Sequence, residues 1–396
     1  MITSVVANET RTVAAGLGFP ALTGRPTSPL GWPGADTVSR GTQETGPNGA
    51  AERKPSERNY GEMASTAAGT TGDVTEDLPR RESEDRAEIA AALPVADEQT
   101  PLARAVADDA RKRITLSGRS VPRPARTRAL TVANQKGGVG KTTTTVNIAA
   151  ALAQAGSPVL VIDLDPQGNA STALGIAHHA EVPSVYDVLV EGRAISEVVQ
   201  TCPDIDGLMC VPATIDLAGA EIELVSLVAR ETRLRNALAA YIEEREAAGE
   251  PLDYVLIDCP PSLGLLTVNA FVAADEVFIP IQCEYYALEG LSQLLRNIEL
   301  IRSHLNPRLH VSTILMTMYD GRTRLSSQVA DEVREHFPDQ TLRASVPRSV
   351  RISEAPSHGQ TVMTYDANSS GALSYLEAAV ELAERGAEPP VIEETA

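Results

Sequence analysis

A glycine-rich loop that carries two lysines is the part of this sequence best suited to chemistry. It reads Lys-Gly-Gly-Val-Gly-Lys-Thr-Thr and stands between a short apolar run and an alanine-rich stretch. Glycines allow successive backbone N–H groups to surround phosphate oxygens, a lysine at the start of the next helix can reach the β- and γ-phosphates, and a neighbouring hydroxyl can bind Mg²⁺. We therefore expect ATP and Mg²⁺ as cofactors, with Thr142 on the metal and the nucleotide held by Lys136, Gly137, Gly138, Val139, Gly140, Lys141, Thr142 and Thr143.

The use of lysine elsewhere in the chain supports a specific role for both loop lysines. Of 34 Lys and Arg residues only four are lysine, and after residue 128 the only lysines are Lys136 and Lys141. Arginine is a planar fork and lysine a compact point charge, so the two are not interchangeable against phosphate. The general P-loop pattern would place a glycine at position 135, where this chain has Gln135, and Lys136 follows it. The loop is therefore a variant of the pattern in which a second ammonium group has a function.

Three carboxylates follow apolar runs and complete the candidate site. They are Asp163, Asp165 and Asp258. A carboxylate near Mg²⁺ can hold the metal or its water, and one near the γ-phosphate can orient an attacking water. An aspartate at the end of a strand can also be a turn or helix N-cap residue. That alternative stays open, above all for Asp163.

The elements that must position these residues alternate between strands and helices. Continuous β-branched runs are typical of strands covered on both faces, and their alternation with helical stretches indicates a mostly parallel sheet with helices on both faces, an α/β fold. Ligands of such sheets bind at the carboxyl ends of the strands. We expect strands at 129–133, 159–163, 254–258, 276–281 and 311–316, and helices at 142–155, 220–245, 287–303 and 326–337.

At this point the chain resembles the ParA/Soj-type partitioning ATPases, whose loop is a deviant Walker A motif. The resemblance rests on residues 136–143 and on four further segments in the family's order, over about 260 residues from Ala129 to near Leu382. These segments are 161–169 (VIDLDPQGN), 255–262 (VLIDCPPS), 321–323 (GRT) and 346–359 (VPRSVRISEAPSHG).

The resemblance implies a P-loop fold and roles for individual residues. Lys136, Lys141 and Asp165 would be catalytic, Asp258 would take the Walker B role on Mg²⁺, and Asp163 would support the same metal site. In the family the lysine equivalent to Lys136 reaches the nucleotide of a second subunit, so a sandwich homodimer is implied. Hydrolysis is expected to be slow, to be stimulated by a ParB-like centromere-binding protein, and to separate the subunits. Weaker carry-overs place Met318 and Pro347 near the adenine.

A cluster of arginines is the candidate surface for double-stranded DNA. The net charge of −19 argues against a general polyanion-binding surface, so DNA must meet a local cluster. Such contacts would be independent of sequence and sensitive to salt. By resemblance Arg322 and Arg351 contact DNA. The alternative is that the cluster makes surface ion pairs with Asp320, Asp331 and Glu354. The arginines concerned are Arg322, Arg324, Arg343, Arg348 and Arg351.

Composition divides the chain into three parts. Residues 1–125 resemble a disordered leader with a basic segment at 101–128, residues 126–385 form the expected ATPase domain, and residues 386–396 an acidic disordered tail. The basic segment carries eight Lys or Arg against two Asp, and it starts with a possible short helix over 101–114. It is either a solvated linker or an arm that contacts DNA or membrane phosphate.

The four cysteines, Cys202, Cys210, Cys259 and Cys283, form no CxxC pair and are expected to be reduced and mostly buried. No signal peptide or membrane-spanning stretch is evident, so a cytoplasmic protein with no membrane partner is expected. The DNA binding that the resemblance implies would make it nucleoid-associated.

Three other readings remain. MinD-like ATPases share the loop but end in a basic amphipathic helix, whereas this chain ends in Glu-Pro-Pro-Val-Ile-Glu-Glu-Thr-Ala. Relatives of the nitrogenase iron protein need paired cysteines for an Fe–S cluster, and the four cysteines lack such a pattern. In a non-enzymatic nucleotide-gated adaptor or repressor, ATP binding alone would set the choice of partner, and Asp165 disfavours this alternative. A cargo-positioning ATPase would differ in its partner rather than in these residues.

Overall fold

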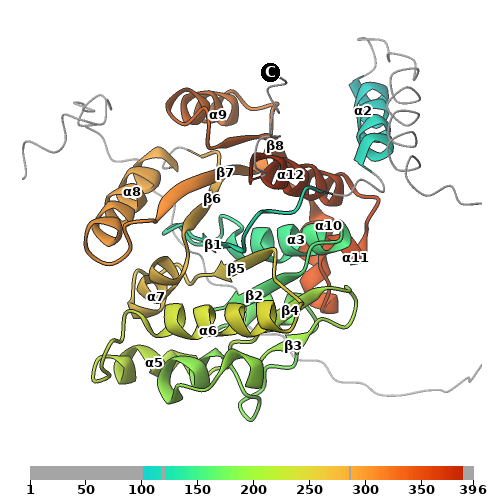
Figure 1. Cartoon of the computed structure of the whole chain (residues 1–396). Helices are drawn as coiled ribbons and strands as arrows, with labels where there is room; N and C mark the ends of the chain where they lie inside the picture. Colours follow the sequence, from blue (N-terminus) through green and yellow to red (C-terminus); the bar gives the residue numbers. More distant parts are fainter. Residues whose placement is uncertain (1–100, 117–120, 285–286, 387–396) are drawn as a thin grey trace, which may run out of the picture. The chain divides into compact units, whose positions relative to one another are not determined.

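The computed structural model describes residues 101–116, 121–284 and 287–386. Its centre is an eight-stranded sheet in the order β3-β4-β2-β5-β1-β6-β7-β8 (Figure 1). All neighbouring strands are parallel except β3 and β4. This confirms the mostly parallel α/β sheet. The strands are β1 Arg128–Val132, β2 Val159–Asp163, β3 Gln200–Thr201, β4 Leu208–Val211, β5 Tyr254–Asp258, β6 Glu276–Gln282, β7 His310–Tyr319 and β8 Thr341–Pro347.

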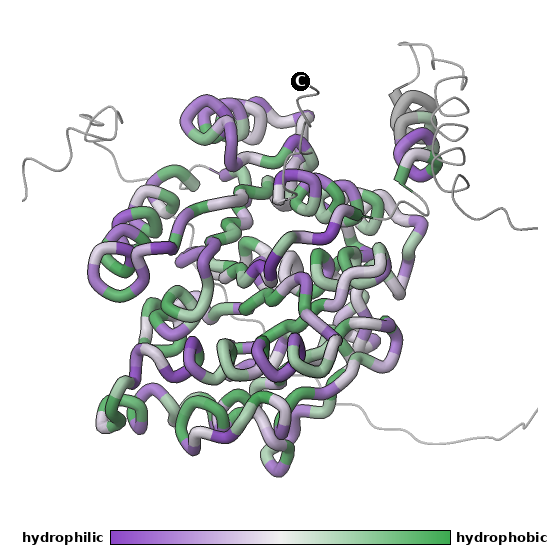
Figure 2. Tube along the Cα trace, viewed as in Figure 1, coloured by the Kyte–Doolittle hydropathy of each residue, from purple (hydrophilic) through white to green (hydrophobic). Residues whose placement is uncertain are grey.

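Helices cover both faces of the sheet because alternate strand residues are apolar on both sides. Leu130, Val161 and Leu256 belong to one core cluster with α3 and α12, whereas Leu160 and Ile257 belong to another with α5, α6 and α7. A third cluster joins β6 and β7 to α7, α8 and α9. Figure 2 shows the middle of the sheet as mainly hydrophobic. The helices of the first face are α3 Lys141–Gln154, α4 Asn169–Ala173, α10 Val350–Glu354, α11 Val362–Tyr365 and α12 Ser370–Gly386; those of the second are α5 Leu217–Leu224, α6 Arg233–Ala247, α7 Leu265–Ala273, α8 Ala287–His304 and α9 Arg324–His336.

The expected helix over 220–245 is wrong, because the chain forms two helices there. α5 ends at Leu224 and α6 begins at Arg233. Between them Ala229 has a φ of 55°, in the left-handed region. Ser226 Oγ donates to the carbonyl of Glu223 and Thr232 Oγ1 to that of Ala229. Hydroxyls that bond nearby backbone offer an alternative to the helix, and the long apolar pattern concealed this break.

The remaining expected elements are present within a few residues, but three strands and the helices α4, α7, α10, α11 and α12 were not predicted. β3 and β4 have only two and four residues, and the apolar pattern of β8 is interrupted by the exposed Arg343. Runs this short or this mixed carry little strand pattern. The missed β8 matters most for function, because its last residue, Pro347, lies at the carboxyl edge of the sheet.

The basic segment is more structured than a solvated linker. Residues Pro101–Leu116 form helix α2, which confirms the expected helix over 101–114. Lys112 Nζ lies 2.6 Å from Glu377 Oε2, and Arg113 donates to the carbonyl of Asn368. Arg123 bonds both carboxylate oxygens of Asp253. Arg128, at the end of the segment, pairs with Glu276. These cations are used within the protein. The rest of the expected leader and the tail from residue 387 lie outside the described residues.

A candidate nucleotide site at the carboxyl edge of the sheet

The glycine-rich loop leaves the carboxyl end of β1 and leads into α3. Gly138 and Gly140 have φ angles of 75° and 87°, which only glycine adopts without strain. No atom lies within 4 Å of a Cβ built on Gly137 or Gly138, so the backbone there is open to a ligand. Val139 is buried, and its carbonyl accepts a 2.8 Å hydrogen bond from Thr317 Oγ1 of β7. The loop is therefore anchored at its centre and open along its glycines.

The first turn of α3 connects the loop to the strand-end carboxylates. Thr142 Oγ1 donates to Asp258 Oδ2 at 2.7 Å, and Thr145 Oγ1 lies 3.2 Å from Asp258 Oδ1. Lys141 is buried, with Nζ 3.4 Å from the carbonyl of Lys136. Burial lowers the pKa of Lys141, and the nearby charge of Asp258 opposes that shift. Lysine, hydroxyl and carboxylate thus meet at one place, as the sequence predicts.

Asp163 and Asp258 lie side by side on β2 and β5 and are fully buried. Burial, followed by the charge of Asp163, raises the pKa of Asp258 to about 8. Burial also raises the pKa of Asp163 to about 6, against the hydrogen bonds from Ser171. Ser171 donates to Asp163 Oδ2 through both N–H (2.9 Å) and Oγ (2.8 Å). The other oxygen, Oδ1, accepts the N–H of Asp165 at 3.1 Å.

Asp163 therefore organises the loop that carries Asp165. Asp165 itself is partly buried, and its Oδ1 accepts the N–H of Gln167 at 3.1 Å. Strands β2 and β5 are neighbours, and the N–H of Leu164 donates to the carbonyl of Asp258, so Asp165 starts its loop beside the Walker B position. Its second carboxylate oxygen has no hydrogen bond within the described residues, which leaves an acceptor for a water molecule.

The residues present fit ATP with Mg²⁺. Two buried carboxylates share the site with Lys141, whose pKa is influenced by the charge of Asp258. Within the described ranges no group of three or more His, Cys, Asp or Glu could hold a metal by itself. Mg²⁺ is typically bound by one or two carboxylates together with substrate phosphates and water. Thr142 and Asp258 are placed to be the protein ligands of such a site. Both oxygens of Asp163 already accept hydrogen bonds, so Asp163 would support the site without binding the metal.

A small cavity of about 100 Å³ adjoins the loop and brings together the two residues expected near the adenine. Met318 and Pro347, at the ends of β7 and β8, line it together with Gly140 and Thr143. Met318 has a φ of 49°, which is strained for a side chain of this size. Tyr375 of α12 also lines the cavity. A base attached to phosphates in the loop could enter here.

The side chain of Lys136 forms an ion pair with a residue outside its own loop. Its Nζ lies 2.6 Å from Glu284 Oε2, just beyond the end of β6, and both side chains are partly exposed. The backbone N–H of Lys136 donates to Asn134 Oδ1 at 3.0 Å. The two lysines therefore have different surroundings: Lys141 faces the buried carboxylates, and Lys136 lies at the surface.

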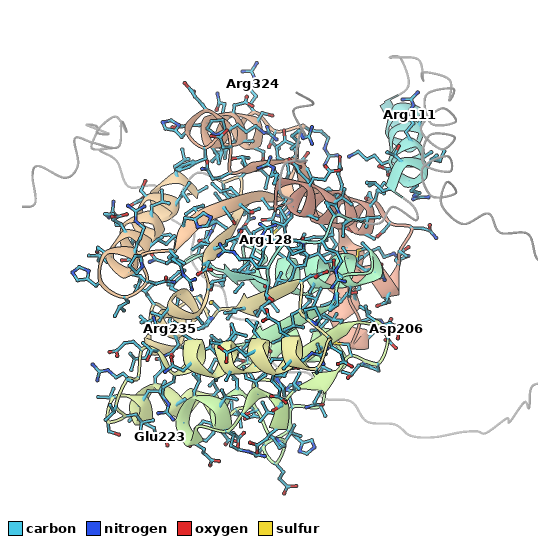
Figure 3. All side chains as sticks on the ribbon, viewed as in Figure 1. Arg111, Arg128, Asp206, Glu223, Arg235 and Arg324 are labelled. Atoms are coloured by element: carbon cyan, nitrogen blue, oxygen red, sulfur yellow. The ribbon has the colours of Figure 1, made fainter. Side chains whose placement is uncertain are left out.

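The candidate DNA-binding arginines fall into two groups. Arg322 is 91% exposed and pairs with Asp320 at 2.9 Å, and Arg351 pairs with Glu354 at 3.3 Å and Asp366 at 3.4 Å. Arg324 and Arg348 have no ion pair within the part of the chain that the structure describes. Figure 3 shows Arg324 extending from α9 away from the protein. The ion pairs expected with Asp320 and Glu354 are thus present, whereas Asp331 pairs with Arg334.

Arg343 is 83% exposed; its Nε lies 3.4 Å from the buried Glu381, and its backbone N–H donates to the same carboxylate.

Four residues of the site carried no signal in the sequence: Thr145, Ser171, Glu284 and Thr317. Each acts through a partner more than seven positions away, such as Thr317 and Val139, which are 178 residues apart. Only Ser171, close behind the aspartate-rich segment 161–169, could have been suspected. The others depend on how the sheet brings strand ends together.

Comparison with known proteins places this geometry in a family. A family model described as "AAA domain" matches residues 127–311. The sporulation initiation inhibitor protein Soj of Bacillus subtilis is 51% identical over 257 residues, which cover 65% of this chain and 98% of Soj. The chromosome partitioning protein ParA of Caulobacter vibrioides is 52% identical over 259 residues, 65% of this chain and 94% of that protein. The chain belongs to the ParA/Soj family.

This ParA/Soj protein shares its fold with solved structures that hold nucleotide. A crystal structure described as cobyrinic acid a,c-diamide synthase from Mycobacterium smegmatis, with bound ATP analogue and magnesium, is 39% identical. The match covers 64% of this chain and 93% of the synthase chain, with a TM-score of 0.54. The chain is therefore a P-loop protein whose ATPase domain is of the chromosome-partitioning type. About a third of it lies outside the match to Soj and ParA.

Proposed function

We propose that this protein is an ATP-dependent DNA-partitioning ATPase. ATP binding would join two copies into a sandwich dimer that binds double-stranded DNA without sequence preference. Hydrolysis, stimulated by a ParB-like centromere-binding partner, would return the protein to single subunits. The observation that carries the proposal is the pair of lysines, one buried among the carboxylates and one at the surface beside Glu284. A surface lysine next to the loop is placed to meet the nucleotide of a second copy.

Within each subunit the residues would divide the work of phosphoryl transfer. Lys141 and the loop N–H groups would bind the phosphates, and Thr142 and Asp258 would hold Mg²⁺, which neutralises charge on the phosphate oxygens when bound. Asp165 would orient the attacking water, and Asp163 and Ser171 would fix the loop that carries it. Catalysis of this kind is mainly positioning and charge neutralisation, so slow turnover is expected without a partner.

The DNA surface would combine the two groups of arginines. Arg324 and Arg348, which have no described ion pair, would contact phosphate directly, and Arg322 and Arg351 would exchange their carboxylates for phosphate. Exposed ion pairs are worth at most about 1 kcal/mol, so this exchange is easily reversed. The protein would then associate with the nucleoid only in its ATP-bound form. The structure describes no helix long and apolar enough to span a membrane.

The test is binding of a labelled DNA duplex with ADP, with ATP, and with ATP on an Asp165→Ala variant that should trap the dimer. Each is measured at about 50 and 200 mM salt. We expect binding by the ATP form and by the trapped variant, none with ADP, and loss of affinity of about tenfold for every phosphate contact or two over this salt range. Arg324→Ala and Arg348→Ala should weaken binding, whereas Arg334→Ala, on the same helix as Arg324 but paired with Asp331, serves as the control.

An ATP-bound dimer that ignores DNA would contradict the DNA role and leave the ATPase intact. A MinD-like or cargo-positioning function, or a nucleotide-gated adaptor, would then be the better description.

A further inference from the structure

Asp165 lies at the start of a tight turn, residues 165–168, which we call the Asp165 turn. The turn closes with a 2.9 Å hydrogen bond from the N–H of Gly168 to the carbonyl of Asp165. Such turns prefer aspartate at the first position, proline at the second and glycine at the fourth, and this chain has Asp165, Pro166 and Gly168 there. The local sequence therefore determines the shape of the turn, whereas its position depends on the residues packed against it.

Thr172 of α4 connects the Asp165 turn to the helix that follows it. Its N–H donates to the carbonyl of Gly168 at 2.9 Å, and its hydroxyl donates to the same oxygen at 3.1 Å. Gly168 is buried and has a left-handed φ of 62°. The last carbonyl of the turn thus receives both hydrogen bonds from one residue. The turn is therefore fixed only as well as Thr172 is fixed.

His178, six residues farther along the chain, contacts both Thr172 and Gly168. Its Nε2 lies 2.9 Å from Thr172 Oγ1. The one proton of that hydroxyl is directed to the carbonyl of Gly168, so the hydroxyl oxygen accepts here and His178 donates, with its proton on Nε2. A Cβ built on Gly168 would lie 2.7 Å from His178 Nδ1. The imidazole therefore lies directly against the Cα of Gly168, and only glycine leaves room for it.

The segment between α4 and β3 determines where His178 lies. The chain turns at Gly175, which has a left-handed φ of 67°. Ile176 is buried in the core cluster that includes α3. Gln200 of β3 donates through Nε2 to the carbonyl of Ala177 at 3.0 Å. The backbone next to His178 is thus held by the core and by the sheet, although the imidazole itself is partly exposed.

We propose that His178 is a positioning residue for ATP hydrolysis, which fixes the Asp165 turn through Thr172 and Gly168. Three hydrogen bonds form the connection: His178 to the Thr172 hydroxyl, that hydroxyl to the carbonyl of Gly168, and the N–H of Gly168 to the carbonyl of Asp165. Asp163 holds the same turn from the strand, by accepting the N–H of Asp165. A carboxylate held in one place orients an attacking water more effectively than one that moves. The role in hydrolysis rests on the proposed function, whereas the fixing of the turn does not.

Two other roles for His178 fit less well. A general base must reach the proton that it removes, but Nε2 of His178 bonds Thr172 and Nδ1 faces Gly168. A metal ligand needs further ligands beside it, and among the residues that the structure describes no group of three His, Cys, Asp or Glu could hold a metal. The contacts of His178 therefore favour an indirect role.

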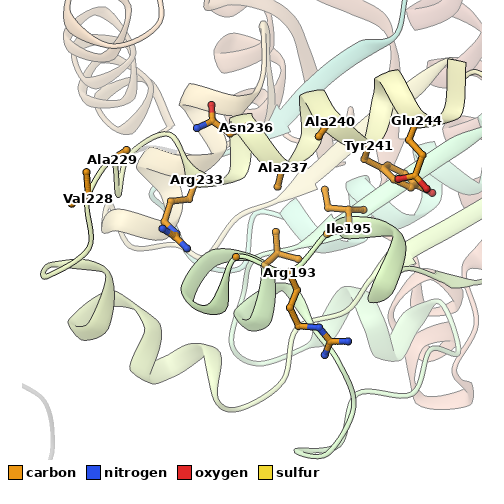
Figure 4. A pocket seen from close by; sticks show the side chains of 13 residues that line it. Arg193, Ile195, Val228, Ala229, Arg233, Asn236, Ala237, Ala240, Tyr241 and Glu244 are labelled. Carbon is orange, nitrogen blue, oxygen red and sulfur yellow. The ribbon is translucent and has the colours of Figure 1, made fainter. Parts of the chain in front are cut away.

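A control for general loosening of the protein lies along α6. A cavity of about 370 Å³ adjoins this helix, and no residue of the Asp165 turn lines it (Figure 4). Arg193 lines this cavity and donates through Nε to Glu197 at 3.2 Å. Arg193→Met therefore removes a side-chain hydrogen bond that does not belong to the connection between His178 and Asp165.

The test compares His178→Met, which keeps the length of the side chain but has no donor, with His178→Gln, whose amide nitrogen can donate to Thr172 in place of Nε2. Hydrogen–deuterium exchange of the backbone over residues 164–172 is measured by mass spectrometry on the full-length protein without nucleotide. We expect exchange at least about threefold faster than wild type in His178→Met and close to wild type in His178→Gln. His179→Met, at the exposed neighbouring position, and Arg193→Met are the matched controls and should leave this segment unchanged.

Steady-state ATP hydrolysis tests the connection to the reaction. His178→Met should lower kcat by about three- to tenfold and leave KM within about twofold, because the loop 136–143 that binds ATP is intact. His178→Gln should recover most of the lost rate. Thr172→Val should lower kcat by a similar factor, and the variant that carries both Thr172→Val and His178→Met should be no slower than either alone, since both act through the same hydroxyl.

Equal exchange over residues 164–172 in the wild type and in His178→Met would overturn the proposal. Faster exchange with an unchanged kcat would overturn it too, because the position of the turn would then not limit hydrolysis. A His178→Gln variant as slow as His178→Met would show that the imidazole acts by its bulk rather than by its hydrogen bond, and would also overturn it. A wild-type protein that does not hydrolyse ATP would remove the proposed function and the role in hydrolysis together, and the exchange measurement would still decide whether His178 fixes the turn.

Discussion

Buried carboxylates occur at both edges of the sheet, and the two edges treat them in opposite ways. At the carboxyl edge Asp163 and Asp258 are fully buried side by side, and burial raises their pKa values. At the amino edge Glu276 is also buried, but Arg128 bonds both of its oxygens at 2.8 and 2.7 Å. Burial alone would raise the pKa of Glu276, and the hydrogen bonds and charge of Arg128 outweigh it, so that pKa is lowered.

Glu381 of α12 repeats the amino-edge arrangement. Its oxygens accept the backbone N–H groups of Arg343 and Ala344 and the guanidinium of Arg385 at 2.6 Å, and these bonds lower its pKa against the effect of burial. At the amino edge the buried carboxylates are therefore neutralised by arginines of the same chain. At the carboxyl edge negative charge remains, and a bound cation must neutralise it. Such uncompensated groups are typical of functional sites, where local stability is sacrificed.

The largest effect is expected at Lys141, the buried cation of the carboxyl edge. Lys141→Ala removes the ammonium group that faces Asp258 and the phosphates, so ATP binding and turnover should both fall by at least about 10³-fold, or ~4 kcal/mol. Isothermal titration with ATP and a phosphate-release assay measure the two. Lys136→Ala is the matched control, because it should leave nucleotide affinity of the single subunit within a few-fold of wild type. Comparable losses of affinity in both variants would contradict the different roles of the two lysines.

At the amino edge the expected loss is in stability. Arg128→Met leaves the buried Glu276 without its ion-pair partner, which should lower the free energy of unfolding by about 3–5 kcal/mol. Chemical denaturation of the nucleotide-free protein measures this. Replacing both residues, Arg128→Met with Glu276→Leu, should recover most of the loss, and a double variant as unstable as the single one would show that packing rather than charge is responsible.

The same pair gives a pH dependence with a definite sign. The pKa of Glu276 is lower in the folded than in the unfolded protein, so the unfolded state binds more protons as the medium becomes acidic. Its contribution is complete above the unfolded value of about 4.3 and is lost as pH falls through the lowered folded value. Denaturation curves between pH 6 and 3 should therefore show that the free energy of unfolding falls more steeply with decreasing pH in the wild type than in Glu276→Gln.

Removal of a charge at the carboxyl edge should raise the free energy of unfolding, whereas Arg128→Met at the amino edge lowers it. Asp258→Asn removes an ionisable group whose charged form is disfavoured by burial and by Asp163, so the nucleotide-free protein at pH 8 with EDTA should gain about 1–2 kcal/mol. The gain in stability on adding ATP and Mg²⁺ should disappear in the same variant. Thermal unfolding with and without nucleotide measures both effects. A destabilised Asp258→Asn protein would mean that the bonds from Thr142 and Thr145 outweigh the buried charge.

The loop and the aspartates of the carboxyl edge could be predicted from sequence. Their supporting residues Thr145, Glu284 and Thr317, and the ion pair of the amino edge, could not. The loop 136–143 and the aspartates at strand ends carry short, dense patterns, because one strand and one turn determine where they lie. Glu276 and Arg128 are 148 residues apart and meet only because β6 pairs with β1. The break between α5 and α6 was hidden by a continuous apolar pattern. Local chemistry is legible in a sequence, whereas partners joined by the sheet depend on its strand order.

The smallest expected effect concerns Lys136, which is not buried at either edge of the sheet. Lys136 and Glu284 are 2.6 Å apart and partly exposed, so their ion pair is worth about 0.2–1 kcal/mol and is screened by salt. If Lys136 must leave Glu284 to reach a second copy, Glu284→Gln should strengthen ATP-dependent dimerisation by up to about fivefold at low salt, and the gain should vanish near 1 M salt. Sedimentation of the Asp165→Ala background measures the dimer, and Glu289→Gln, an exposed carboxylate of α8 without a described ion pair, is the control. A weaker dimer in Glu284→Gln would instead place Glu284 in the contact between subunits. The exposed pair would then support the assembled state, as Arg128 and Glu276 support the single subunit.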